Sequence, residues 1–372
     1  MKIERLPEGD YVWRISLSVE SRSNVSRLWI SEHEMRFGAV LLKMGGVGGV
    51  GTNVEHRWKG YSRRVMEDST ALMREYGFDV AMLFGIPDFY SKFGYATTLP
   101  EVRVAFNAAD AEEAISSYQI RKFETRDTAK VLEIYAANNA ERTGTLVRYA
   151  ACWRGFKMGS SWSERAAAFV IVDEADEVIG YFVCDDTEKH CILSDIGFQS
   201  RTIFETIAHF LADGASRMGV ARIECAIPPD HPFVIFCRRY GCKTSIHDSK
   251  NSGGMMRIVN QSSTLEKITG ELGKRLQRSA QFSQWSGRIG ITTDLQCDCL
   301  VIDRGHAGHT TNDTNAYQLE IPQDKLIQLM MGRRNIQDLA VDADVSVDAE
   351  IIPVLGTLFP LGYPHVWWPD RF

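Results

Sequence analysis

The sequence predicts an α/β protein of three domains, and three observations support this. The chain has 372 residues, which suits two or three domains of roughly 100 to 200 residues each. In the first third, a strand, a loop rich in glycine and cations, a helix and a buried strand follow one another. The middle third repeats this order, and the last third begins after a polar stretch.

The composition excludes several classes of protein. It is 44% hydrophobic and 24% charged, as in ordinary globular proteins, and no stretch approaches the ~20 apolar residues of a membrane span. The start MKIERLPEGDYVW lacks the pattern of a secretory signal, so we expect a cytoplasmic protein without membrane contact. The net charge of -6 argues against general binding of nucleic acid.

The sequence does not predict a metal site. The eight cysteines include no CxxC pair, so buried free thiols are expected. His306 and His309 lie in a polar stretch without neighbouring acids or cysteines. We therefore expect neither a zinc site nor disulfides.

The first elements are predicted to be strands. DYVWRISLSVE is typical of a strand, and the short apolar runs at 27–30 and 36–43 predict a hairpin that turns at the polar SEHEM between them. A third strand is predicted at 47–52, VGGVGT, which is unusually rich in glycine. Because glycine weakens a strand, its presence favours close approach by a ligand or by another backbone.

A helix and a buried strand follow. Apolar residues from Tyr61 to Tyr76 have helical spacing, and Gly77 stands where a helix-ending glycine belongs. The run DVAMLFGI then predicts a strand buried on both faces. A short helix, FYSKF, ends at Gly94, and a strand at 102–106 precedes a polar boundary at 107–117.

The middle third repeats the order of strands and helices of the first third, without the loop rich in glycine and cations. The predicted elements are a helix at 130–142, a hairpin turning at 174–177, a strand at 190–198, a helix from Ile203 to Ala215 and a strand at 221–227. IPDFYSKFGY and the later IPPDHPFVIFCRRYG both place an aromatic helix after a buried strand. We interpret this as a degenerate internal duplication.

The last third predicts an α+β domain. A polar boundary is predicted at 259–267. Beyond it come a helix to Arg278, strands around 287–292, 295–303 and 317–321, and helices at 322–332 and 348–356. The chain ends in the aromatic tail LFPLGYPHVWWPDRF.

The segment RWKGYS, residues 57–62, predicts a phosphate site. Gly60 allows close backbone approach, and the amides after it begin a helix whose dipole favours an anion. Arg57, Lys59, Arg63 and Arg64 add positive charge. The alternative is a glycine-rich turn with solvated cations.

These residues match a known family. The order strand, R-x-x-G-x-[small], helix, buried strand and FYSKFGY resembles the acetyl-coenzyme A binding core of the GNAT N-acetyltransferases. The layout is similar to the Eis-like (enhanced intracellular survival) group: tandem GNAT domains, the second degenerate, followed by a sterol-carrier-protein-like α+β domain. The resemblance implies domains at 1–112, 113–260 and 261–372.

The resemblance also implies site residues. Main-chain groups of Val50 and Thr52 would bind the pantetheine of acetyl-coenzyme A. The pyrophosphate would be surrounded by Arg57, Lys59, Gly60, Tyr61 and Ser62. Tyr90 would be the general acid that protonates the departing thiolate, since a phenol near pKa 10 and a thiol near 8.5 exchange a proton at little cost. The alternative is that Tyr90 only packs beside Phe89 and Phe93.

A base for the amine is less obvious. VGGVGT offers no carboxylate, whereas in the Eis-like group the C-terminal carboxylate takes this role, which implies Phe372 here. The apolar, proline-stiffened tail suits a terminus threaded into a core. The alternative is a packed end without a catalytic part, and Asp370 between Pro369 and Arg371 suggests a local ion pair.

The expected function is an N-acetyltransferase that moves acetyl from acetyl-coenzyme A directly to a primary amine, without a metal. The resemblance implies an aminoglycoside, polyamine or lysine-like acceptor and a homo-oligomer, a hexamer in the Eis-like group. Two features depart from the family. Only about 25 residues precede SRLWI, and GFQSRTIFE in the second domain lacks the R-x-x-G loop, so one coenzyme site per chain is expected. The alternatives are an inactive coenzyme-binding or regulatory protein, or a hydrophobic-ligand binder acting through the C-terminal domain.

Overall fold

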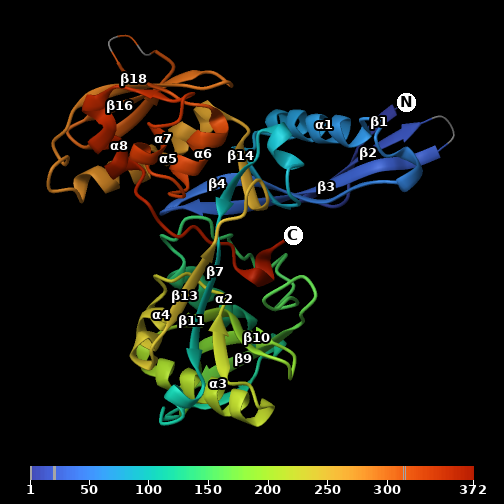
Figure 1. Cartoon of the computed structure of the whole chain (residues 1–372), viewed down its shortest axis with the longest axis vertical. Helices are drawn as coiled ribbons and strands as arrows, with labels where there is room; N and C mark the ends of the chain where they lie inside the picture. The colour runs from blue at the N-terminus through green and yellow to red at the C-terminus, as the bar shows by residue number, and fades with distance from the viewer. Residues whose placement is uncertain (1, 20–21, 313, 315) are drawn as a thin grey trace.

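Three sheets form the framework of the protein. The computed structural model describes residues 2–19, 22–312, 314 and 316–372. Within these residues, two sheets have seven strands each and a third has five (Figure 1). The first and third domains lie side by side, the second lies below them, and the C-terminus ends where the domains meet.

The first sheet is mostly antiparallel and carries one helix on its face. Its strands, in spatial order, are β1 (Lys2–Pro7), β2 (Val12–Val19), β3 (Arg22–Phe37), β4 (Val40–Thr52), β5 (Val80–Gly85), β14 (Gly253–Ile258) and β6 (Ala96–Leu99). The predicted helix is α1 (Tyr61–Glu75), and Gly77 follows it in the left-handed conformation. The predicted buried strand is β5, and the predicted short helix is η2 (Tyr90–Phe93), which ends at Gly94.

The predicted turn at SEHEM is wrong, because β3 runs straight through it and the chain turns at Gly38 and Ala39. Leu28 and Ile30 belong to the core beneath α1, whereas Met35 and Phe37 belong to the core shared with the third domain. One strand therefore buries even-numbered residues on one face and odd-numbered residues on the other. The polar residues between these sets mark the change of face rather than a turn.

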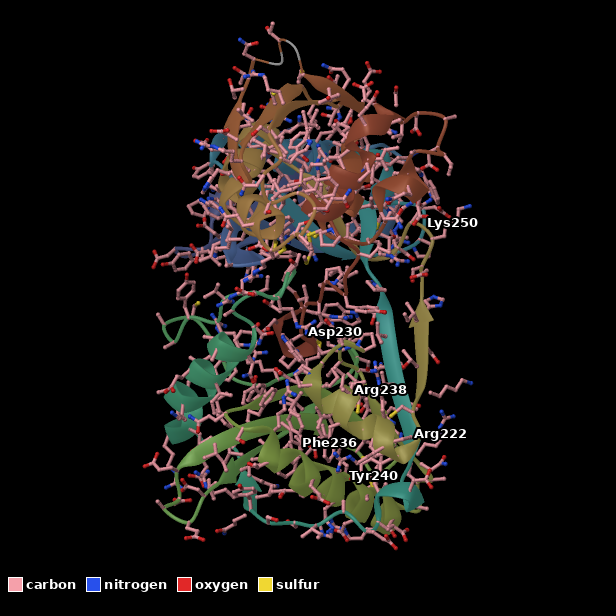
Figure 2. The ribbon with its side chains drawn as sticks, turned by 90° about the vertical axis from the view of Figure 1, so that its left-hand side faces the viewer. Arg222, Asp230, Phe236, Arg238, Tyr240 and Lys250 are labelled. Carbon is pink, nitrogen blue, oxygen red and sulfur yellow. The ribbon has the colours of Figure 1, made fainter. Side chains whose placement is uncertain are left out.

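The first two sheets exchange strands. The strand predicted at 102–106 is β7 (Glu101–Asn107), which pairs in the second sheet with β12 (Arg222–Cys225) and β13 (Lys243–His247). The chain then returns past Lys250 to add β14 to the first sheet, antiparallel to β5 (Figure 2). Sheet membership thus changes at Pro100, before the predicted polar boundary, and β14 joins the first sheet although it lies within the range 113–260.

The second sheet repeats the order of the first. From β13 and β7, it continues through β12 (Arg222–Cys225), β11 (Cys191–Phe198), β10 (Val178–Asp185), β9 (Ala166–Val172) and β8 (Gln119–Lys122). Its helices are α2 (Thr128–Asn138), α3 (Phe204–Met218) and α4 (Pro232–Cys237). Helix α2 ends earlier than the predicted 130–142, and the predicted hairpin is β9–β10.

The parallel strand pairs show the duplication. In the first sheet β4 and β5 are parallel and joined by α1, with η2 after β5. In the second sheet β11 and β12 are parallel and joined by α3, with α4 after β12. The fold is therefore a mixed α/β structure with tandem related sheets and a third sheet domain.

The third domain packs against the first. Its strands, in spatial order, are β17 (His306–Thr310), β16 (Cys297–Asp303), β15 (Gly287–Thr292), β18 (Tyr317–Glu320) and β19 (Ser346–Val347). Its helices are α5 (Gln261–Gln277), α6 (Gln323–Met330), α7 (Ile336–Leu339) and α8 (Ile352–Leu358).

The polar boundary predicted at 259–267 is the first half of α5 rather than a linker. Ser263 donates to the buried carboxylate of Asp79 at 2.6 Å, and Lys267 pairs with the same carboxylate at 2.7 Å. The polar side chains of this stretch therefore bind across the interface with the first domain.

Candidate active site

Strands β4 and β5 form a fork at the centre of the first sheet. Their parallel pairing covers only Met44 to Gly46 on β4, whereas β4 stays paired with β3 as far as Thr52. Beyond Gly46, no described strand covers the edge of β4 that faces β5. Val50 and Thr52 lie in this segment, and an open strand edge can hydrogen-bond an extended amide chain.

The predicted phosphate loop has the geometry of an anion site. Gly60 is the N-cap of α1 with φ 75°, and no side chain caps the helix. A side chain at Gly60 would meet nothing within 4 Å, and the first turn of α1 contains no acid. Arg57 and Lys59 are exposed just before it. The first amides of α1, those of Tyr61 and Ser62, lack intrahelical partners and can serve an anion.

Tyr90 lies beside the end of β5. The residue is 8% exposed, and its ring meets Phe89 edge-on at a centroid distance of 4.8 Å. A Cβ atom at Gly85 would lie 2.6 Å from Tyr90 Cδ2, so this glycine makes room for the ring. Burial raises the pKa of the Tyr90 phenol, which therefore carries its proton at neutral pH. The geometry accommodates both the catalytic and the packing role.

Phe372 lies against the glycines of β4. A Cβ atom at Gly46 would lie 2.8 Å from Cε2 and Cζ of the Phe372 ring. At Gly48 it would lie 3.5 Å from the Phe372 carbonyl carbon. The ring stacks on His33 at 5.0 Å and meets Phe84 at 5.8 Å. The glycine-rich strand thus accommodates the tail of its own chain.

Tyr90 and Phe372 stand on opposite faces of the sheet. Tyr90 contacts Gly85, and Phe372 contacts the adjacent Phe84. Successive residues of a strand point to opposite faces, so the two groups flank the fork from either side. A thioester held in the fork would have a phenol on one face and the end of the tail on the other.

A polar pair, Ser31 and His33, lies beside the Phe372 ring, and no sequence pattern indicated it. His33 Nε2 lies 2.8 Å from Ser31 Oγ, which also donates to the carbonyl of Gly46 at 3.2 Å. Burial lowers the pKa of His33 to about 4, so the imidazole is neutral at pH 7. Because both residues lie in the segment predicted to turn, their alternation along β3 was missed.

The predicted local ion pair between Asp370 and Arg371 is wrong. Asp370 instead accepts from Arg148 Nε at 2.7 Å, and Arg371 donates to Glu101 at 2.8 Å. Both partners lie more than two hundred positions away along the chain, so local sequence cannot reveal them. Trp367 is also held, since its Nε1 donates to Asn139 at 2.9 Å.

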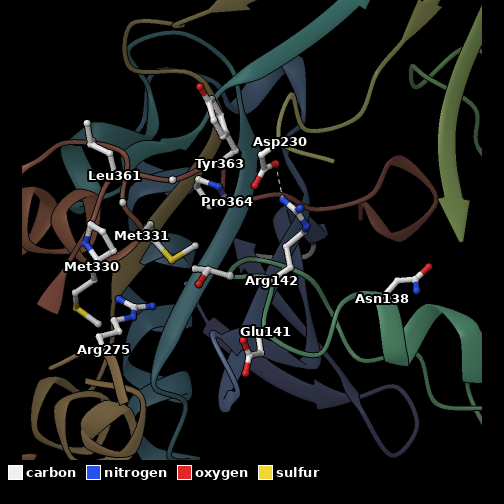
Figure 3. A pocket seen from close by; sticks show the side chains of 14 residues that line it. Asn138, Glu141, Arg142, Asp230, Arg275, Met330, Met331, Leu361, Tyr363 and Pro364 are labelled. Carbon is white, nitrogen blue, oxygen red and sulfur yellow. Dashed lines mark hydrogen bonds and ion pairs between the residues drawn. The ribbon is translucent and has the colours of Figure 1, made fainter. Parts of the chain in front are cut away.

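A separate hollow lies between the second and third domains. Its volume is about 360 Å³, and Figure 3 shows Arg142, Arg275 and Tyr363 in its wall, with Arg142 paired to Asp230. It does not include the residues of the fork. No group of three potential metal-ligating residues occurs within the described ranges. Among the described residues, no helix is both long enough and apolar enough to cross a membrane.

Comparison with known proteins identifies the fold. Residues 15–98 match the family model of an acetyltransferase (GNAT) domain. No curated protein matches the sequence. A probable N-acyltransferase from Enterococcus faecalis matches at TM-score 0.76 and 17% identity, covering 97% of this chain and 89% of that one.

Two further structures match along almost the whole chain. A GCN5-related N-acetyltransferase from Anabaena variabilis has TM-score 0.74 and 16% identity, covering 97% and 90% of the two chains. Eis1 from Mycobacterium abscessus has TM-score 0.65 and 15% identity, covering 96% and 90%. Identities this low show a shared fold alone. Residues 15–98 thus match a GNAT acetyltransferase domain, and the chain as a whole shares its fold with these proteins.

Proposed function

We propose that the protein is an N-acetyltransferase that moves acetyl from acetyl-coenzyme A directly to a primary amine. The observation that carries this proposal is the position of Phe372, whose carbonyl carbon lies beside Gly48 at the fork, with Tyr90 on the opposite face. A fork alone suits coenzyme binding. A fork flanked by a phenol and a carboxyl group suits proton transfer to and from a reacting thioester.

The coenzyme would bind along β4 and the start of α1. The pantetheine amides would pair with the main chain of Val50 and Thr52 on the open strand edge. The pyrophosphate would lie at the α1 N-terminus, on the amides of Gly60, Tyr61 and Ser62 and near Arg57 and Lys59. The thioester would then lie in the fork itself.

Proton transfer would accompany the exchange of acyl bonds. The Phe372 carboxylate would take a proton from the incoming ammonium, and the free amine would attack the thioester carbonyl carbon. The tetrahedral intermediate would collapse with cleavage of the C–S bond, and the Tyr90 hydroxyl would give its proton to the departing thiolate. The nitrogen would release its remaining extra proton to water, and water would return a proton to Tyr90, so that a neutral amide and free coenzyme A result. Burial raises the pKa of Tyr90, and the same surroundings would raise that of the thiol, so the two stay comparable.

The acceptor is proposed by class only: an aminoglycoside, a polyamine or a lysine-like amine. A cytoplasmic location, a homo-oligomer such as a hexamer, and a sterol-carrier-like third domain that takes an apolar ligand remain predictions. The domain ranges 1–112, 113–260 and 261–372 also remain predictions, with strands crossing between the first two.

A second candidate is a coenzyme-binding protein without turnover. The observation that favours it is the packing of Tyr90, which is 8% exposed and meets the Phe89 ring edge-on at 4.8 Å, as expected of a core residue. The two candidates differ in one respect: only the enzyme releases coenzyme A in response to an amine.

The test is release of free coenzyme A from acetyl-coenzyme A across aminoglycosides, polyamines and lysine peptides, using protein with an untagged C-terminus. We expect amine-dependent release. A variant with one glycine added after Phe372 is the matched control, because it moves the carboxylate without changing the coenzyme site. Its kcat should fall while the Kd for acetyl-coenzyme A stays unchanged. Binding without release for any amine would favour the second candidate.

A further inference from the structure

The second sheet has a fork of its own, formed by β11 and β12. These strands are paired in parallel from Cys191 to Leu193 on β11, and β11 then continues to Phe198 beside β10. It corresponds to the fork of β4 and β5, because α3 and α4 take the places of α1 and η2. The tail of the chain lies here, since the 3-10 turn η8 (Trp368–Asp370) packs against β11.

The tail is built into the core of the second domain. Trp367 is 1% exposed and belongs to that core. Its ring meets His231, the N-cap of α4, at 5.9 Å, and its Nε1 donates to Asn139 after α2. The tail therefore occupies the region that corresponds, in the first domain, to the proposed coenzyme site.

The phosphate site is also lost in the second domain. Ser200 caps the turn before α3, because its Oγ accepts from the amide of Thr202 at 3.3 Å. In the first domain the equivalent amides at the start of α1 have no side-chain cap. The second domain has thus satisfied its helix start internally and filled its fork with protein.

Arg148 connects this second fork to the end of the tail. Its Nε donates to Asp370 at 2.7 Å, and its Nη2 donates to Asp195 of β11 at 2.6 Å. The side chain of Arg148 is 1% exposed, that of Asp370 is 5% exposed and that of Asp195 is 0% exposed. Tyr135 lies under the guanidinium group at 3.8 Å and also donates to Asp370 at 3.2 Å. A buried ion network is costly to desolvate, so its value lies in fixing one geometry.

We propose that the second domain serves as the holder of the tail, and that Arg148 and Asp195 are positioning residues for the Phe372 carboxyl group. This inference rests on the proposed function of that carboxyl. Asp370 is two residues from Phe372, and two extended residues span at most ~7 Å. Arg371 between them is fixed by Glu101 and by stacking on Trp368 at 3.5 Å. Little freedom remains for the carboxyl group once Asp370 is bound.

The test compares Arg148→Met with Arg121→Met. Arg121 makes a bidentate pair with Asp127 in the same domain, at 2.8 Å for both bonds, and this pair does not involve the tail. Two readouts are used: the release of Phe372 by a carboxypeptidase, and kcat and KM for acetyl-coenzyme A in the full chain. Asp370→Asn, which keeps the shape of the side chain, is the second variant in case Arg148→Met does not fold.

In Arg148→Met we expect at least about tenfold faster release of Phe372 and a fall in kcat of about tenfold to a hundredfold, because displacement of a reacting group by 1 Å has costs of this size. KM for acetyl-coenzyme A should change less than about twofold, since the coenzyme site is untouched. Asp370→Asn should show the same pattern with smaller changes. Arg121→Met should match wild type in both readouts.

Three results would overturn the inference: unchanged release of Phe372 in both tail variants, unchanged kcat in both, or equal changes in Arg121→Met. If the proposed function is wrong, the two readouts give a different result. In that case wild type would transfer acetyl to no amine, while the release of Phe372 would still depend on Arg148.

Discussion

Gly46→Ala should displace the tail from the fork. The new Cβ would lie 2.8 Å from Cε2 and Cζ of Phe372 and 2.8 Å from Ser31 Oγ. Ordinary contacts begin near 3.4 Å, so the ring must move by about 0.6 Å. If a 1 Å displacement of a reacting group costs about a hundredfold, this movement costs about tenfold in kcat.

The assay measures initial rates of coenzyme A release with saturating acetyl-coenzyme A, beside a thermal melt. Overpacking costs about 1–3 kcal/mol, part of which is offset because alanine restricts the unfolded chain more than glycine does. We therefore expect a modest loss of stability and a larger loss of kcat. Gly51→Ala is the matched control on the same strand, because its Cβ would meet only the Gly49 carbonyl oxygen, at 3.8 Å.

A double variant separates steric displacement from other effects. In Gly46→Ala with Phe372→Leu, the smaller side chain removes the contact with the new methyl group, so part of the lost kcat should return relative to Phe372→Leu alone. The reasoning is refuted if Gly46→Ala keeps the wild-type kcat, or if Gly51→Ala loses as much activity.

Further substitutions test the Tyr90 phenol, the proposed phosphate loop and the partly buried His33. Tyr90→Phe should lower kcat by about 100-fold while the Kd for acetyl-coenzyme A stays unchanged, because only the proton donor is removed; a wild-type rate would exclude Tyr90 from the reaction. Arg57→Ala with Lys59→Ala should weaken coenzyme binding by roughly tenfold or more, with a smaller salt dependence than wild type in a titration followed by calorimetry. The pKa of His33 is lowered to about 4 from 6.5, so its contribution to stability is present above pH 6.5 and is lost as pH falls towards 4. Between pH 7 and 4, the free energy of unfolding from urea melts should therefore fall less in His33→Gln than in wild type, the difference being on the order of 3 kcal/mol at most. An equal fall in both proteins would contradict a neutral imidazole in the folded state.

Local sequence patterns predicted several elements of the first domain. Helix α1 and its closing Gly77 follow from helical spacing and from the left-handed turn that glycine allows. Strand β5 follows from an uninterrupted apolar run, and the start of α1 from the glycine at position 60. Each of these signals lies within a few residues along the chain, where periodicity and turn chemistry act directly.

The same reasoning failed where one element serves two cores. SEHEM was predicted to turn because its polar residues interrupt the apolar pattern, yet β3 continues and uses the interruption to change its buried face. The polar start of α5, within the boundary predicted at 259–267, binds Asp79 through Ser263 and Lys267, a contact that its polarity alone did not indicate. Polarity marks a contact with water or with a buried polar partner, and a sequence pattern cannot distinguish the two.

By itself, the sequence determined helix α1 with its glycine ends, the buried strand β5 and the repetition of a strand, helix and strand unit. Only the tertiary structure decided that β14 completes the first sheet, that the glycines of β4 accommodate Phe372, and that Arg148 holds Asp370. The reason is physical: backbone preferences and periodicity act between near neighbours. An ion pair or ring contact between residues more than a hundred positions apart depends on how the domains pack.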